Sequence, residues 1–411
     1  MIQHYGYGHI EDGSNRLLFK KGKYIMRYYI IAGEKSGDLH GGDLITALPE
    51  KDPKAEFRYW GGGCMEQASG YPAVVHYEKL AVMGLDFLGK ILHLFQYLKY
   101  CKKDLLVYQP DALILIDYSG FNLHIAKYAK QNNIRTYYYI APKVWAWRPQ
   151  RIKTIKRYVD RMFTIFPFEK SFFSKYNYNV DFVGNPTVQQ VRAYATNSHF
   201  LIQKKLDSRP IIALLPGSRM DEVKRILPIL YEVTTLFPNY QFVVAATKDL
   251  PTTLYGKTQK YSNTKLVYEA TYDLLAHAYA AIITSGTATL EAALYNVPQI
   301  VVYRTNGIAY WLYKKLVHIP YVSLVNILIE APIVTELIQG QCTKEEIKKE
   351  LNKLLADKEW RQKQQQGYLK IKNLLGNDDP AQTVANHVVN DICRNRTIDL
   401  APVIRTVRKA T

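Results

Sequence analysis

The chain of 411 residues is 48% hydrophobic and 22% charged, the composition of a globular protein, and its length favours two domains over a single core. It has no window of about 18 uninterrupted apolar residues, so the sequence predicts no transmembrane helix. Its 54 Lys and Arg against 36 Asp and Glu give a formal net charge of +18, which suits an anionic partner, but their scatter along the chain argues against nucleic acid.

The first 25 residues are polar and Gly-rich, and they lack the apolar segment of a secretory signal. Met26 stands directly before the first strand-like run, so we expect residues 1–25 to be a poorly ordered extension. The four cysteines are widely spaced and form no Cys-x-x-Cys pair. This pattern is typical of a reduced, cytosolic protein without a disulfide framework or a zinc site.

Short apolar runs alternate with helix-length segments through the chain. The runs span residues 28–32, 112–116, 136–140, 162–166, 211–215, 241–246, 280–284 and 299–302. They predict parallel strands with helices on both faces. A polar stretch over 189–209 divides them, so we expect an α/β fold of two doubly wound Rossmann-like domains, 26–190 and 191–365, facing each other across a cleft. We expect the helices of 366–411 to pack back on the first domain or on a partner subunit.

The first run ends in a glycine-rich turn, Gly33-Glu34-Lys35-Ser36-Gly37-Asp38. Glycines at a strand-to-helix turn let another segment or a ligand approach the backbone closely. Glu34 would project into the cleft at the carboxyl end of the strand, where it is a candidate catalytic acid. The alternative is a charge that stabilises the N-terminus of the following helix.

An apolar helix is predicted between Met83 and Tyr100. Apolar side chains recur in it at helical spacing, at Leu85, Leu88, Ile91, Leu92, Phe95 and Leu98. Such a stripe favours burial in a core. However, Phe87 and Leu94 extend the apolar surface beyond the stripe, and Lys90 and Lys99 lie nearby, which also fits a helix resting on a bilayer. The candidates for membrane or acyl-chain contact are Leu85, Phe87, Leu88, Ile91 and Leu94.

Asp117 directly follows the run 112–116, at the carboxyl end of a strand. A carboxylate there can act as a general base, accepting a hydroxyl proton as the oxygen attacks an electrophile. The alternative is a cap for the helix that starts near Asn122, and spacing alone does not separate the two. The next strand is followed by Lys143-Val144-Trp145-Ala146-Trp147-Arg148, whose rings and cations suit a sugar or a phosphate but are also found in cores.

Two small-residue turns follow strands of the second half, Pro216-Gly217-Ser218-Arg219 and Thr284-Ser285-Gly286-Thr287-Ala288-Thr289-Leu290-Glu291. A strand that turns through Gly and Ser into a helix presents backbone N–H groups, which favour phosphate oxygens. Arg219 adds a planar fork that suits the same anion. Together the turns predict a nucleotide diphosphate held between loops.

These motifs together resemble the lipid-A-disaccharide synthase family, which are glycosyltransferases of the two-domain GT-B type. The likeness extends in one order from Met26 to the 390s. The matching segments are 33–38, 81–84, Asp117 with 121–122, 144–148, 167–170, 215–219 with Glu222, 285–291, 321–324 with Asn326, and 336–339.

The resemblance implies that 2,3-diacylglucosamine is transferred from UDP-2,3-diacylglucosamine to 2,3-diacylglucosamine 1-phosphate (lipid X). The reaction inverts the donor carbon, forms a β-1,6-linked disaccharide and releases UDP. By resemblance, Asp117 is the base for the acceptor 6-hydroxyl and Glu34 a second essential acid. The implied donor-binding residues are Gly217, Ser218, Arg219, Ser285, Gly286, Thr287, Thr289, Glu291 (to ribose hydroxyls), Asn326 and Gln339. No cofactor and no metal ion are expected, because arginine and helix dipoles would neutralise the diphosphate.

The family also suggests a homodimer and a cytoplasmic protein that associates peripherally with the inner membrane. Two departures stand out: Gly120 replaces the second acid that the family usually has, and Ala331-Pro332 replace an Arg-Glu pair. The alternatives are another GT-B enzyme acting on a UDP-GlcNAc-type sugar, either a glycosyltransferase or a 2-epimerase, and a basic protein that binds nucleic acid.

Overall fold

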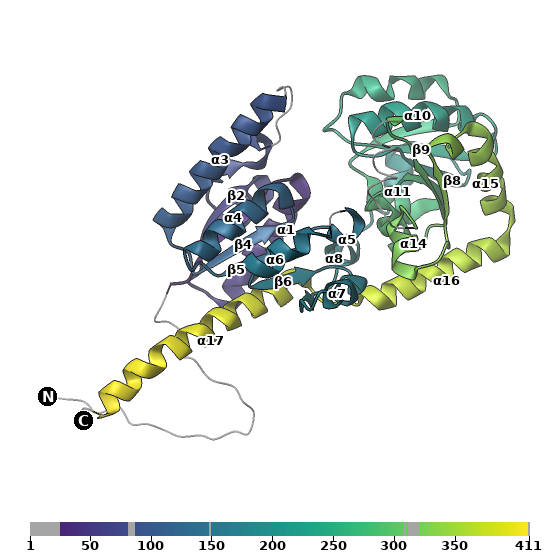
Figure 1. Ribbon diagram of the computed structural model, residues 1–411. Helices are drawn as coiled ribbons and strands as arrows, with labels where there is room; N and C mark the ends of the chain where they lie inside the picture. The colour runs from purple at the N-terminus through teal and green to yellow at the C-terminus, as the bar shows by residue number, and fades with distance from the viewer. Residues whose placement is uncertain (1–24, 81–86, 148, 308–309, 311–319, 410–411) are drawn as a thin grey trace.

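In the computed structural model, residues 25–80, 87–147, 149–307, 310 and 320–409 are described, and within them the chain forms two parallel sheets. The first has seven strands in the order β3-β2-β1-β4-β5-β6-β7, and the second has six in the order β10-β9-β8-β11-β12-β13. Helices flank both sheets, and the two units lie next to each other (Figure 1). The predicted fold class, two doubly wound α/β domains, is confirmed.

The strands are short, and the central ones are buried on both faces. In the first sheet they are β1 (Arg27–Ala32), β2 (Glu56–Gly61), β3 (Val75–His76), β4 (Ala112–Ile116), β5 (Thr136–Tyr139), β6 (Arg161–Thr164) and β7 (Asp181–Phe182). In the second they are β8 (Ile211–Leu215), β9 (Gln241–Ala246), β10 (Thr264–Tyr268), β11 (Ala278–Thr284), β12 (Gln299–Tyr303) and β13 (Thr335–Ile338). Every apolar run noted in the sequence contributes a strand.

The helices connect consecutive strands. The first unit contains α1 (Lys35–Lys51), α2 (Gly63–Ser69), α3 (Phe87–Tyr108), α4 (Ser119–Gln131), α5 (Val144–Trp147), α6 (Arg151–Tyr158) and α7 (Pro167–Ser174), with a 3₁₀ turn η1 (Tyr77–Lys79). There follow α8 (Pro186–Ala193), α9 (Phe200–Gln203), α10 (Met220–Thr234), η2 (Thr252–Lys260), α11 (Thr271–His277), α12 (Ala288–Leu294), α14 (Leu324–Ile329), η3 (Gln339–Gln341), α15 (Lys344–Ala356), α16 (Lys358–Leu375) and α17 (Pro380–Lys409).

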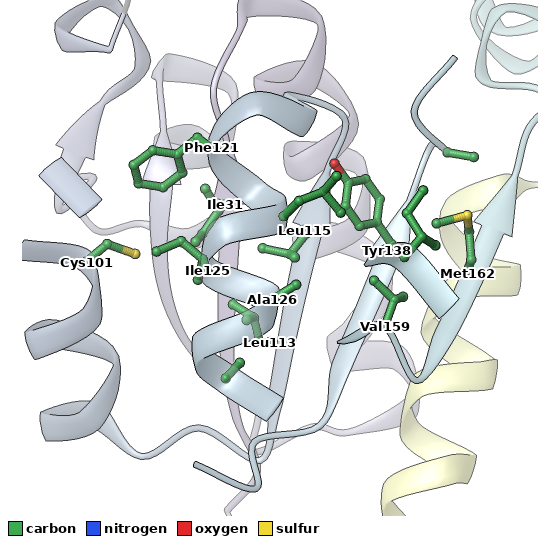
Figure 2. Packing of buried hydrophobic residues seen from close by; sticks show 14 of the residues in the cluster. Ile31, Cys101, Leu113, Leu115, Phe121, Ile125, Ala126, Tyr138, Val159 and Met162 are labelled. Atoms are coloured by element: carbon green, nitrogen blue, oxygen red, sulfur yellow. The ribbon is translucent and has the colours of Figure 1, made fainter. Parts of the chain in front are cut away.

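Alternate residues of the central strands face opposite helical layers. Ile31 of β1 packs with Leu115 of β4 and Phe121 of α4, in the cluster drawn in Figure 2. The neighbouring Ile30 faces the other layer, where it shares a core with Val384 of α17. Because both faces are covered, the strands are apolar throughout rather than alternating.

The chain passes between the two units at two places that touch each other. After β7, Gly184 has a φ of 93°, and an added Cβ would stand only 2.8 Å from the carbonyl oxygen of Asp378, which follows α16. Beside this contact, Gln189 Nε2 donates to the carboxylate of Asp379 at 2.5 Å. A glycine is therefore needed here both for its backbone conformation and for the close approach.

The divisions expected at 190/191 and 365/366 fall within α8 and α16, and both helices pack on the second unit. Of the described helices after residue 366, α17 is the one that returns to the first unit (Figure 1), where it packs against α1. Of the extension expected at 1–25, residues 1–24 lie outside the described part of the chain. Among the described helices, none has the length and apolar character that a membrane span requires.

Candidate active site

Asp117 stands where β4 ends, and its backbone is unusual. Asp117 and Tyr118 both have a φ of 42°, a left-handed conformation that is costly for residues other than glycine. Asn122 Nδ2 donates to the Asp117 carbonyl at 2.9 Å, and the Tyr138 hydroxyl donates to the same oxygen. Tyr118, not Asp117, holds the N-cap position of α4, and the Asp117 carboxylate accepts a hydrogen bond from the Tyr118 backbone. The N-cap position is therefore taken by the next residue, and Asp117 stays a candidate base.

Glu34 lies at the neighbouring strand end, since β1 pairs with β4 up to Ala32 and Ile116. It is exposed, and although it occupies the N-cap position of α1, its side chain makes no cap hydrogen bond. This position at the N-terminus of α1 also fits the alternative expected from the sequence, a charge that stabilises the helix end. The two predicted acids are therefore brought to the same edge of the first sheet.

Four influences act on the pKa of Asp117. Burial raises it above the ordinary value for an aspartate, the nearby Lys143 ammonium opposes this rise, the Glu34 carboxylate adds to it, and a hydrogen bond from the Tyr118 backbone lowers the pKa. A base whose pKa is raised is better matched to accepting a proton near neutral pH. Lys143 and Asp117 are thus electrostatically coupled at the carboxyl ends of β4 and β5.

Asp38, which ends the glycine-rich turn, and Gly42, one turn further along α1, both contact the segment that starts α2. The Asp38 carboxylate accepts hydrogen bonds from the backbone N–H groups of Gly62, at 2.6 Å, and Cys64, at 3.0 Å, and so caps α2. An added Cβ on Gly42 would meet the carbonyl oxygen of Cys64 at 3.0 Å. The close approach that these glycines allow is therefore made by another segment of the chain.

A cavity of about 720 Å³ lies between the two units. The first unit contributes Lys143, Trp145 and Ala146 to its wall, and the second contributes both small-residue turns. The predicted residues that line it are Gly217, Ser218, Arg219, Ser285, Gly286, Thr287 and Glu291. Asp117 and Glu34 are not in the wall of this cavity, and Lys143 connects it to Asp117. Elsewhere between the units, Lys35 forms an ion pair of 2.6 Å with Asp249.

The first small-residue turn is built around a glycine. Gly217 has a φ of 109°, and an added Cβ would stand 2.5 Å from Glu222 Oε2. Glu222 accepts hydrogen bonds of 3.4 Å from the backbone N–H and from the guanidinium of Arg219. The Arg219 side chain is nevertheless 81% exposed, so it can reach an anion in the cavity.

Glu291 also lines the cavity, and it is less exposed than Arg219. Burial raises its pKa to about 7, and the Tyr272 hydroxyl donates to Oε1 at 3.5 Å. A carboxylate in this position can accept hydrogen bonds from the hydroxyl groups of a ligand.

Three residues that the resemblance assigns to donor binding are not brought to the cavity wall. Thr289 is fully buried, and its hydroxyl donates to the Gly286 carbonyl at 2.8 Å. Gln339 exchanges two hydrogen bonds with the backbone of Thr305, at 3.0 and 3.2 Å. In both cases the polar groups support loops within the protein.

Asn326 is the third of these residues, and it is 1% exposed. Its amide nitrogen donates to the Val334 carbonyl at 3.0 Å and to Glu336 Oε1 at 2.9 Å. Its oxygen accepts from the N–H groups of Ile333 and Val334 at 2.9 and 3.0 Å. With its hydrogen bonds made inside the protein, Asn326 is a positioning residue for the segment after α14, and a direct contact with the donor is not supported.

Some cavity residues have no counterpart in the sequence-based prediction. Glu269 lines the cavity directly after β10, and its carboxylate accepts from the Lys248 N–H at 3.0 Å. The rule that ligands meet the carboxyl ends of strands would have identified it, had the run Thr264–Tyr268 been recognised as a strand. Of the two departures, Gly120 has open space around its Cβ position, and Ala331 packs against the cluster under α16.

Of the five candidate residues for membrane contact, Leu94 is the one whose side chain lies in the described part of the structure. Leu85 lies outside the described residues, as do the side chains of Phe87, Leu88 and Ile91. Leu94, expected to widen the exposed surface, instead packs against the core of the first unit. Conversely, Leu92 and Phe95, expected in the buried stripe, are 61% and 64% exposed. Leu98 of the same stripe is buried as expected, so the described side chains agree with the predicted stripe only in part.

In the described part of the chain, no group of three or more His, Cys, Asp or Glu side chains is arranged to hold a metal ion.

Comparison with known proteins gives consistent matches. Residues 28–385 match the family model described as lipid-A-disaccharide synthetase. The lipid-A-disaccharide synthase of Coxiella burnetii (strain Dugway 5J108-111) is 36% identical over 373 residues, covering 88% of this chain and 97% of that protein. The Geobacter metallireducens enzyme of the same name is 35% identical over 378 residues, covering 90% and 98%.

Two solved structures share the architecture. The UDP-GlcNAc 2-epimerase from Neisseria meningitidis, bound to UDP-GlcNAc, has a TM-score of 0.57 at 13% identity and covers 90% of this chain and 100% of its own. The glycotransferase of kitacinnamycin has a TM-score of 0.61 at 12% identity, with the same coverage. At such low identity these likenesses show the fold alone.

Proposed function

The chain belongs to the lipid-A-disaccharide synthetase family and is a glycosyltransferase, and we propose from this premise that it joins two acylated glucosamine units. The donor is UDP-2,3-diacylglucosamine and the acceptor is 2,3-diacylglucosamine 1-phosphate. The observation that carries the proposal is the cavity between the sheets, which both small-residue turns line on one side and Lys143 and Trp145 line on the other.

The proposed chemistry is one in-line displacement. Asp117 accepts the proton of the acceptor 6-hydroxyl while that oxygen attacks the anomeric carbon of the donor. The bond between this carbon and the diphosphate oxygen breaks at the same time, so the configuration inverts and UDP leaves. Glu34, exposed at the adjacent strand end, helps to orient the acceptor.

The leaving group gains negative charge as it departs, and preorganised donors stabilise it. We assign this role to Arg219, to the backbone N–H groups of the turns at Ser218 and Thr287, and to Lys143 from the opposite wall. Glu291 would accept hydrogen bonds from the ribose hydroxyls.

A direct test is to incubate the purified protein with both acylated monosaccharides and to follow disaccharide and UDP by mass spectrometry. The expected result is equal formation of both products, which requires both substrates. A reaction of the donor without acceptor, giving a 2-epimer, would instead identify an epimerase and contradict the proposal.

We further propose that the protein works at the cytoplasmic face of the inner membrane, because both substrates carry acyl chains. The exposed Leu92 and Phe95 of α3 would enter the interface, and the lysines of the same helix, such as Lys99, would meet anionic headgroups.

A further inference from the structure

Glu169, on the first turn of α7, is a buried carboxylate that the proposed chemistry leaves without a role. It is 1% exposed. Its Oε2 accepts from the backbone N–H groups of Ile165, at 3.2 Å, and Phe166, at 3.1 Å. Its Oε1 accepts from the indole N–H of Trp145 at 3.1 Å. One oxygen therefore fixes the acid to its own segment, and the other holds a residue of the cavity wall.

Trp145 belongs to α5, which spans only Val144–Trp147. A helix of one turn has little stability of its own, so its position depends on contacts with its surroundings. The Trp145 ring meets Phe168 edge to face, with centroids 5.0 Å apart, and Phe168 stacks on Phe166 at 5.7 Å. Phe166 in turn lies in a core shared with Leu290 of α12 in the second unit.

The indole is thus held from two sides, by a carboxylate at its N–H and by an aromatic ring that leads to the other unit. Trp145 lies in the wall that faces the small-residue turns, two residues from Lys143, which neighbours Asp117. A sugar that extends from a diphosphate in the turns toward Asp117 passes this wall. Glu169 is not part of the wall and therefore acts only through another residue.

We infer that Glu169 is a positioning residue that fixes the Trp145 indole as a rigid wall for the sugar of a nucleoside-diphosphate-linked hexose. The inference rests on the proposed function. A rigid aromatic face offers a sugar ring a large contact area at little cost in conformational entropy. Burial raises the pKa of Glu169 to about 7, opposed by the three hydrogen bonds and by Lys143, so the carboxylate is ionised and a full acceptor in mildly alkaline solution.

The test uses a variant that removes only the acceptor for Trp145. In Glu169→Gln, the amide oxygen can still accept from the two backbone N–H groups, and the NH₂ group then faces the indole N–H, donor against donor. Trp145→Phe removes the N–H but keeps an aromatic ring. We expect each variant to raise the KM for the UDP-sugar by roughly tenfold, with kcat within about threefold and the Kd of UDP alone unchanged.

The double variant separates a positioning role from a general structural one. If Glu169 acts through Trp145, the KM of the double variant should equal that of the single variant that binds the UDP-sugar more weakly. The second change then removes no further interaction. Multiplying effects, or a Glu169→Gln variant with the wild-type KM, would overturn the inference.

A second readout does not depend on the reaction. In full-length protein labelled with 5-fluorotryptophan, the ¹⁹F resonance of Trp145 is the one lost in Trp145→Phe. We expect Glu169→Gln to shift or broaden this resonance in the ligand-free protein and to leave that of Trp60, in the core of the first unit, unchanged. An unchanged Trp145 resonance would refute the positioning role even if the proposed transfer reaction were correct.

Phe168→Leu provides the same test from the other side of the ring, should Glu169→Gln fail to fold. It loosens the edge-to-face contact while leaving the carboxylate in place, so it should move the same resonance and raise the same KM. If Phe168→Leu changes neither the Trp145 resonance nor the KM, the result would also count against a role of these contacts in fixing the Trp145 ring. The two proposals can also be separated in the other direction. If the wild-type protein forms no disaccharide but the Trp145 resonance shifts in the variants, the proposed function is rejected and the positioning role is retained.

Discussion

The ring of Tyr118 occupies the space in which Gly33 would carry a Cβ: an added Cβ would stand 2.2 Å from Tyr118 Cδ1. This contact joins the ends of β1 and β4, which carry Glu34 and Asp117. The left-handed backbone of Tyr118 accompanies this placement of the ring. The relative position of the two acids therefore depends on a glycine that has no polar group of its own.

Gly33→Ala should disturb the acids without touching the nucleotide turns. The new methyl group must displace Tyr118, and Asp117 moves with it, so we expect kcat to fall by at least about tenfold. The Kd of UDP, measured by calorimetry, should stay within about twofold, because the turns lie in the other unit. Gly63→Ala is the matched control, since no atom lies within 4 Å of its added Cβ. Wild-type turnover in Gly33→Ala would show that the acids tolerate displacement.

The pH dependence of transfer should report Asp117. The base must be ionised, so kcat/KM is high above its pKa and falls as the pH drops through it. Because burial raises this pKa, the fall should occur at a higher pH than for an ordinary aspartate. Lys143→Gln removes the cation that favours the carboxylate, so the pKa should rise further and the acid limb should move to higher pH. Asp117→Asn, which retains UDP binding, should be nearly inactive at every pH; a limb that stays in place in Lys143→Gln would rule out the coupling.

Glu291→Gln should lower the affinity for UDP and raise the stability of the folded protein at alkaline pH. Folding raises the pKa of Glu291 from 4.5 to about 7, so its contribution to stability is full below the lower value and is lost as the pH rises through the higher one. The neutral glutamine avoids this loss and should stabilise the protein by on the order of 1–3 kcal/mol at about pH 8.5, with little effect near pH 5. Thermal unfolding at both pH values measures this. UDP should bind more weakly, and equal melting temperatures at alkaline pH would contradict the assignment.

The sequence predicted the central strands because residues such as Ile30 and Ile31 must be apolar on both faces of a covered sheet. It did not predict β2, β3, β7, β10 or β13; in β2, β7 and β10, Arg58, Asp181 and Lys265 interrupt the apolar pattern. All five lie at a sheet edge or next to one, where the helical layers cover the faces less completely and polar side chains can reach solvent.

The sequence predicted which two turns line the cavity, but not the orientation of every side chain assigned to it. Ser218 and Arg219 lie in the turn that follows β8, so strand direction alone places them in the cleft. Whether Thr289 or Asn326 faces the cavity depends on the rotation of a short helix and on partners such as Glu336, which only the folded structure supplies. In α3 the expected stripe is buried at Leu98 but not at Leu92, because apolar residues on two of its faces, such as Leu92 and Leu94, make its periodicity ambiguous.

The exposed face of α3 can be tested with vesicles. Replacing Leu92 and Phe95 together by Ser should weaken sedimentation with phosphatidylglycerol vesicles by roughly tenfold, since two apolar side chains no longer enter the interface. The melting temperature should change little, because both side chains are already more than half exposed. Leu369→Ser with Leu374→Ser, on α16 of the other unit, is the control, at 60% and 46% exposure. Equal loss of binding in the two double variants would mean that α3 is not the contact.

Asn326→Ala distinguishes a positioning residue from a ligand contact. The change leaves the N–H groups of Ile333 and Val334, the Val334 carbonyl and the Glu336 carboxylate each short of a partner. Unpaired buried groups of this kind cost roughly 1–3 kcal/mol each, so the melting temperature should fall by several degrees or more. UDP should still raise that lower melting temperature by nearly the wild-type increment, because the cavity wall is made by other residues. The opposite pattern, a wild-type melting temperature with no response to UDP, would place the Asn326 amide on the nucleotide.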